Sequence, residues 1–200
     1  MKRLLIFPLV LLSTGLFAQK FQIGIKGGVN VSNFTGSNFQ NFDTKPLVGF
    51  HAGGILAFLL GNNFAIQPEV LFSSQGARLS DGTTSKDYKV SYLTVPVLAK
   101  YRFNGGFYLE AGPQFGFKLN ENIPYDQSIN SFAKNLDVSI DGGIGFHGNA
   151  GFGIGARYCL GISKVGNFNS TVQPGYDPNF KNGVAQLFIF YTLFNNHRDK

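Results

Sequence analysis

Residues 107–118 read FYLEAGPQFGFK, and an apolar residue or proline occupies every second position of this stretch. The positions between them are mostly polar, charged or small, and they include Glu110 and Lys118. A period of two residues is typical of a β-strand with one apolar face and one polar face. The same pattern recurs along the chain, which predicts an all-β protein built from similar strands.

The alternation predicts eight strands, separated in turn by long polar loops and short turns. The strands cover residues 21–31, 46–60, 64–73, 89–103, 107–118, 135–147, 150–163 and 183–194, and the long loops cover 32–45, 74–88, 120–134 and 164–182. Short turns on one side, long loops on the other and an even strand number are typical of outer-membrane barrels. We therefore predict an eight-stranded antiparallel up-and-down transmembrane β-barrel over residues 19–194, followed by a short polar tail, 195–200.

Residues 1–18, MKRLLIFPLVLLSTGLFA, have the pattern of a secretory signal peptide. Lys2 and Arg3 begin the segment, an apolar run follows, and Ala18 ends it. The apolar run is shorter than the roughly 20 residues that a transmembrane helix needs. We predict cleavage after Ala18 and export, and together with the strand pattern this places the mature chain in the outer membrane of a Gram-negative cell.

The amino-acid composition limits the classes of protein to which this chain can belong. Charged residues make up only 14% of the chain, which is low for a soluble surface. The net charge is +6, but no basic run exceeds two residues, so we predict no nucleic-acid partner. Cys159 is the single cysteine and cannot form an intrachain disulfide.

Strand parity assigns one face of the barrel to lipid and the other to the lumen. Side chains fill the interior of an eight-stranded barrel, and buried charges need partners. We therefore predict a largely closed lumen with a charge network of Lys26, Glu69, Lys100, Arg102, Glu110, Lys118, Asp137, Asp141 and Arg157. A soluble barrel of lipocalin type, with the two faces exchanged, would give the same alternation and stays open as an alternative.

Several sequence patterns could indicate catalysis or ligand binding, but each also has a simpler structural interpretation. Residues 143–148, GIGFHG, match GxGxxG, but they lie inside a predicted strand rather than between a strand and a helix. His51 and His147 are candidate metal ligands or bases, and Glu69 with Glu110 is a candidate acid and base pair; we interpret all four as hydrogen-bonded or ion-paired lumen residues. We predict no enzymatic activity, no cofactor and no metal site.

Two further features concern the strands and the loops. Pro68, Pro96 and Pro113 lie within predicted strands, and we predict β-bulges there because proline lacks a ladder donor. Seven aromatic residues lie in the predicted loops: Phe39, Phe42, Tyr125, Phe132, Phe168, Tyr176 and Phe180. They fit either a partner surface or a rim at the lipid headgroups. We predict a monomer surrounded by outer-membrane lipid, with a protein partner or small ligand at the extracellular loops.

Three segments carry a resemblance to a known family: GIKGGVNVSNF (24–34), SYLTVPVLAKYRF (91–103) and FYLEAGPQFGF (107–117). With the predicted signal peptide, they resemble the PorT-like outer-membrane β-barrel domain family of Bacteroidetes-type bacteria, over residues 19–194. The resemblance implies a small barrel with no catalytic residues to carry over, and it suggests a link to secretion machinery. The predicted function is a structural or partner-binding barrel; a small solute or ion pore is the alternative.

Overall fold

The computed structural model describes residues 20–36, 43–80, 85–122, 133–165 and 180–193. The predicted signal peptide, 1–18, and the predicted tail, 195–200, lie outside the described residues, as do all the loop aromatics named above except Phe180. Those assignments therefore stay predictions from the sequence.

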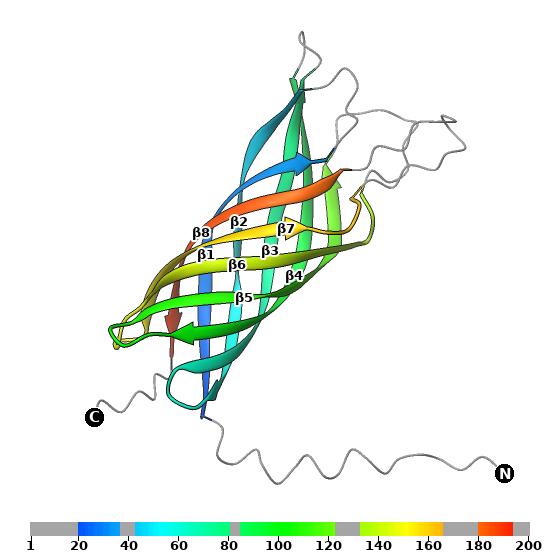
Figure 1. The fold of residues 1–200 in the computed structure, drawn as a ribbon. Coiled ribbons are helices and arrows are strands. Elements are labelled where there is room, and N and C mark those ends of the chain that lie inside the picture. Colours follow the sequence, from blue (N-terminus) through cyan, green and yellow to red (C-terminus); the bar gives the residue numbers. More distant parts are fainter. Residues whose placement is uncertain (1–19, 37–42, 81–84, 123–132, 166–179, 194–200) are drawn as a thin grey trace, which may run out of the picture.

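Eight strands form one closed antiparallel barrel, which confirms the predicted fold (Figure 1). They are β1 (Lys20–Thr35), β2 (Asp43–Leu60), β3 (Phe64–Ser80), β4 (Ser85–Arg102), β5 (Phe107–Asn122), β6 (Leu136–His147), β7 (Phe152–Gly161) and β8 (Lys181–Thr192). Each strand pairs with its sequence neighbours, and β1 pairs with β8 to close the sheet. No helix among the described residues is long and apolar enough to cross a membrane.

The short turns define one end of the barrel. Residues 61–63, 103–106 and 148–151 make these turns, and Gly61 and Gly151 adopt φ angles of +88° and +87°, which glycine accepts without strain. β1 begins and β8 ends at the same end (Figure 1). Short turns of outer-membrane barrels face the periplasm, so we call this end periplasmic and the opposite end extracellular.

The prediction of a long loop over 74–88 is wrong. β3 continues to Ser80 and β4 begins at Ser85, and the two strands stay in register between them, with Ser80 opposite Ser85. The polar residues of this segment suggested a loop. They are polar because the hairpin extends past the apolar surface of the barrel, while the backbone pairing continues.

The prediction of β-bulges at the three prolines is also wrong. The strand register is the same on both sides of Pro68, Pro96 and Pro113. The register shifts lie instead at 46–51 between β2 and β3 and at 91–92 between β4 and β5. A proline removes one ladder donor, and here the ladder continues past each proline without an inserted residue.

The apolar faces of the strands point outward. Ile25 is 63% exposed and Leu187 is 62% exposed, whereas Glu110 and Arg157 are 4% and 3% exposed inside the barrel. A surface of this composition is stable in hydrocarbon and unstable in water. The structure therefore selects the membrane orientation and excludes the lipocalin-type alternative.

Candidate functional site

The centre of the lumen holds a buried group of five charged side chains, which we call the central charge cluster. Its members come from β1, β3, β5, β6 and β7, and they are Lys26, Glu69, Glu110, Asp141 and Arg157. All five face inward because each occupies the inward parity of its strand. The cluster therefore connects five of the eight strands through side chains alone.

Glu69 and Arg157 form the core of this cluster. The Arg157 guanidinium donates two hydrogen bonds to the Glu69 carboxylate, each 2.9 Å long. Lys26 Nζ lies 2.9 Å from Glu69 Oε1, and Arg157 Nη2 lies 2.7 Å from Glu110 Oε1. Asp141 is more distant, with its Oδ2 3.8 Å from Arg157 Nη1. A bidentate, fully buried arginine–carboxylate pair combines charge with fixed geometry.

Inward glycines make room for these long side chains. A Cβ atom on Gly143 would lie 3.0 Å from Glu110 Oε1, and one on Gly155 would overlap the Tyr108 hydroxyl. The narrow barrel interior cannot hold a side chain at every inward position. These two glycines thus leave the space that the side chains of Glu110 and Tyr108 occupy.

An apolar layer closes the lumen on the periplasmic side of the cluster. It contains Ile55, Tyr108, Phe188 and Phe190. Lys26 Nζ lies 3.7 Å from the centre of the Phe188 ring, which adds a cation–π contact to the ion pair. The segment around these phenylalanines, LFIFYTLF, is apolar on both faces of its strand, and this was the sequence signal for an apolar lumen layer.

A second apolar cluster fills the extracellular side of the lumen. It consists of Phe34, Ala77, Val90, Tyr92, Ala133, Val165 and Phe180. The rings of Phe34 and Phe180 lie 4.7 Å apart between centroids. Phe180 was predicted to be a loop aromatic without a core, and the structure buries it in this cluster. The central charge cluster is therefore covered from both ends.

Two of the nine predicted network residues lie toward the periplasmic end. Lys100 Nζ donates a 3.3 Å hydrogen bond to Gln67 Oε1 and lies 3.8 Å from the Tyr108 ring centre. Arg102 donates a 3.0 Å hydrogen bond to Asn149 in a periplasmic turn. The central charge cluster is held together by the ion pairs of Glu69 and Arg157, and neither Lys100 nor Arg102 takes part in those pairs, so both lie outside the cluster.

The other two predicted residues lie toward the extracellular end. Lys118 Nζ is 3.1 Å from Glu121 Oε2 and donates a 2.6 Å hydrogen bond to the Ala133 carbonyl. Asp137 accepts hydrogen bonds from Ser163 and Asn182. Strand parity gives the face of a side chain but not its height in the barrel, and this is why these residues are separated from the cluster.

A neutral hydrogen-bonded group beside the cluster was missed from the sequence. Asn30 donates to Ser73 Oγ at 3.1 Å, and Gln186 donates to Asn30 Oδ1 at 3.1 Å. His51 Nδ1 lies 2.7 Å from Asn30 Oδ1. His51 was predicted to be a hydrogen-bonded lumen residue, whereas its partners Asn30, Ser73 and Gln186 were not predicted, and their inward parity was the available signal.

The candidate catalytic or metal-binding residues have structural partners. His147 Nε2 lies 3.2 Å from Thr192 Oγ1, and its ring packs edge-on against Phe190. Within the part of the chain that the structure describes, no group of three or more His, Cys, Asp or Glu side chains could hold a metal ion. The arrangement suits a packed structural core better than a reaction centre.

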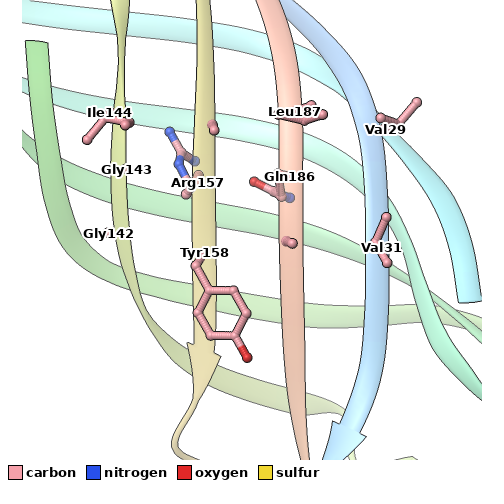
Figure 2. A pocket seen from close by; sticks show the side chains of 11 residues that line it. Val29, Val31, Gly142, Gly143, Ile144, Arg157, Tyr158, Gln186 and Leu187 are labelled. Carbon is pink, nitrogen blue, oxygen red and sulfur yellow. The ribbon is translucent and has the colours of Figure 1, made fainter. Parts of the chain in front are cut away.

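The outer surface carries a shallow apolar groove across β6, β7, β8 and β1 (Figure 2). Val29, Ile144 and Leu187 line it, together with the small residues Gly142 and Ala156. Its exposed lining is almost entirely apolar. The groove belongs to the lipid-facing surface and offers no chemistry beyond contact with hydrocarbon.

The model of the outer membrane protein β-barrel domain family matches residues 17–167. The chain belongs to this family. Its fold is similar to OprG, an outer membrane protein of Pseudomonas aeruginosa, with 12% identity over 88% of this chain and 97% of that one and a TM-score of 0.55. Neisserial surface protein A is similar too, with 13% identity over 84% and 96% of the two chains and a TM-score of 0.51. No curated protein matches the sequence.

Family and fold together place this barrel in the outer membrane. The outward apolar surface and the inward charges are the physical basis of that location. At 12% and 13% identity, the two solved structures show the fold alone.

Proposed function

We propose that this protein is a closed outer-membrane barrel that acts through its extracellular end as a structural or binding platform. The observation that carries the proposal is the bidentate Arg157–Glu69 pair in the middle of the lumen. A solute crossing the barrel would have to separate this pair. Removing one partner from a buried ion pair costs about 3–5 kcal/mol.

The lumen layers on both sides of the cluster support a closed barrel. Phe188 and Phe190 lie on the periplasmic side, and Phe34 and Phe180 lie on the extracellular side. Among the described residues, these packed aromatic side chains place an apolar layer on each side of the charge cluster, which opposes the passage of water and ions. The same packing supports a non-enzymatic role, because Glu69 is already held by Lys26 and Arg157.

The platform is proposed to work as a monomer through the connections at its extracellular end. The long loops are the part of an outer-membrane barrel that varies and meets the outside. The PorT-like resemblance of residues 91–103 and 107–117 adds a finer proposal, in which the platform serves secretion machinery. A protein partner that copurifies in a manner dependent on those loops would support it.

Planar-bilayer recording of the purified protein tests the proposal. We expect no stable single-channel steps from the wild-type barrel, with insertion verified by a heat-modifiable gel shift. Reproducible conductance steps from inserted wild-type protein would instead establish the pore alternative.

A further inference from the structure

Strands β2, β3 and β4 reach beyond the rest of the barrel at the extracellular end (Figure 1). Their outward face there carries three cations, one on each strand: Lys45, Arg78 and Lys89. We call these three residues the basic patch. Lys45 lies directly opposite Arg78 in the sheet, and Lys89 lies opposite Gly76, two residues nearer the membrane on β3. Neighbouring strands are about 4.8 Å apart, so the three side chains share one small surface.

The basic patch begins where the lipid-facing surface ends. Val48, three residues after Lys45 on β2, is 69% exposed, and Leu93, four residues after Lys89 on β4, belongs to the same apolar outer face. Three to four residues span about 10–13 Å of strand, or roughly 8–10 Å of height at a tilt near 40°. The headgroup layer on each side of a bilayer is about 5–8 Å thick. Lysine side chains reach across the remaining distance.

The charge of the patch is only partly neutralised by the protein. Arg78 holds Asp87, with Nε 2.5 Å from Oδ1 and Nη2 3.3 Å from Oδ2. Lys45 and Lys89 are exposed, and among the described residues neither ammonium group has a hydrogen-bond or ion-pair partner. Among the side chains that the structure describes on this outward face, three cations stand against one carboxylate, that of Asp87, which leaves a surplus of positive charge next to the bilayer surface.

We propose that Lys45, Arg78 and Lys89 bind the phosphate of a lipid headgroup in the outer leaflet. Ammonium and guanidinium groups are the side chains that bind phosphate in proteins. The patch faces sideways and is continuous with the apolar surface below it, so a bound headgroup keeps its acyl chains in the membrane. A soluble anion gains nothing from the neighbouring apolar surface, so it would not favour this side of the hairpin over the mouth of the lumen. The inference is independent of the proposed platform function.

Native mass spectrometry of the full-length chain in detergent tests this site, with phosphatidic acid as the probe and phosphatidylcholine of the same acyl composition as its reference. We expect the wild type to bind phosphatidic acid more tightly. The double variant Lys45→Gln/Lys89→Gln should lose that affinity by about tenfold or more, since each basic residue at a membrane surface contributes about fivefold. Neither lysine has a hydrogen-bond or ion-pair partner among the described residues, so the variant should remain folded in a heat-modifiable gel shift.

A matched double variant, Lys134→Gln/Lys181→Gln, removes the same charge from the other side of the extracellular rim. It should bind phosphatidic acid as the wild type does. Equal binding of the two lipids, or equal losses in the two double variants, would overturn the proposal. Displacement of the lipid by low millimolar inorganic phosphate would assign the patch to free phosphate, and tighter binding of a sulfated polysaccharide would assign it to a soluble polyanion; either result would also overturn it.

Discussion

Replacing Arg157 with methionine should destabilise the barrel strongly, because it removes one centre of positive charge from three buried carboxylates. Arg157 donates both hydrogen bonds that hold Glu69 on one side, and among the described residues it is the sole hydrogen-bond donor to the Glu110 side chain. Lys26 still neutralises Glu69 in the variant, but Glu110 is left buried without a hydrogen-bonded cation. Methionine fills most of the volume, so the loss is mainly electrostatic.

The expected cost follows from the buried pair. Removing one partner of a buried ion pair costs about 3–5 kcal/mol, and 4 kcal/mol is about a thousandfold change in the unfolding equilibrium. Urea unfolding of the folded protein in phospholipid vesicles, followed by the heat-modifiable gel shift, measures the free energy of unfolding. The chain has no tryptophan, so the gel shift is a better readout than intrinsic fluorescence.

A double variant separates charge from packing. Arg157→Met/Glu110→Gln removes the stranded carboxylate as well and should recover about 1–3 kcal/mol of the loss. Lys134→Met, which removes an exposed cation at the extracellular rim outside the basic patch, serves as the control and should unfold as the wild type does. A cost below about 1 kcal/mol for Arg157→Met, or a double variant no better than the single one, would refute a stabilising role for the central charge cluster.

Three further predictions concern the glycines, the lipid face and the hairpin tip. Gly155→Ala should destabilise the barrel by about 1–3 kcal/mol through overpacking, because its Cβ would press on Tyr108 and Phe188, whereas Gly142→Ala on the outer face meets no atom within 4 Å and should be neutral in the same urea assay. Leu187→Arg places a charge in hydrocarbon and should cost about 2–4 kcal/mol near the midplane; an unchanged unfolding midpoint would contradict the lipid-facing assignment. The hydrogen bond from Arg78 lowers the pKa of Asp87 below its ordinary value of 3.8. The ion pair should therefore protect the backbone amides at the end of the β3–β4 hairpin from hydrogen exchange fully above pH 3.8, and this protection should fall as the pH drops through the folded-state pKa. Hydrogen exchange at the tip measures this, and Asp87→Asn should abolish the pH dependence.

Strand parity in the sequence was sufficient to predict the barrel and its two chemically different faces. Alternation along 107–118 and its repeats predicts the strand number and the separation of apolar from polar side chains, because lipid and a narrow lumen impose opposite chemistry on alternate residues. Which face points outward had to come from the structure, since a soluble barrel with the faces exchanged gives the same alternation. Parity fails where that contrast disappears. The outward face of the β3 and β4 extension lies beyond the lipid and carries polar residues such as Arg78 and Asp87, and β8 is apolar on both faces because Phe188 and Phe190 fill the lumen.

The composition of the candidate site could be anticipated only in part. The inward face of a charged residue follows from the sequence, but its partner depends on strand tilt and on the register between distant strands. Glu69 and Arg157 are 88 positions apart and meet across the lumen. Lys118 lies on the same inward face as Glu110 yet pairs near the rim with Glu121. The register continues unchanged across the three prolines, so residue type alone did not indicate where the bulges lie.

The side-chain links among β1, β3, β5, β6 and β7 have a consequence for assembly. Arg157 is supplied late in the chain, whereas Lys26 and Glu69 are supplied early, so the cluster can form only when the sheet has curled up completely. Before closure the charged side chains remain hydrated. An incomplete sheet that carries hydrated charges cannot insert stably into hydrocarbon. Insertion and closure are therefore expected to be a single concerted event, and the ionic centre acts as a check that the last strands have arrived.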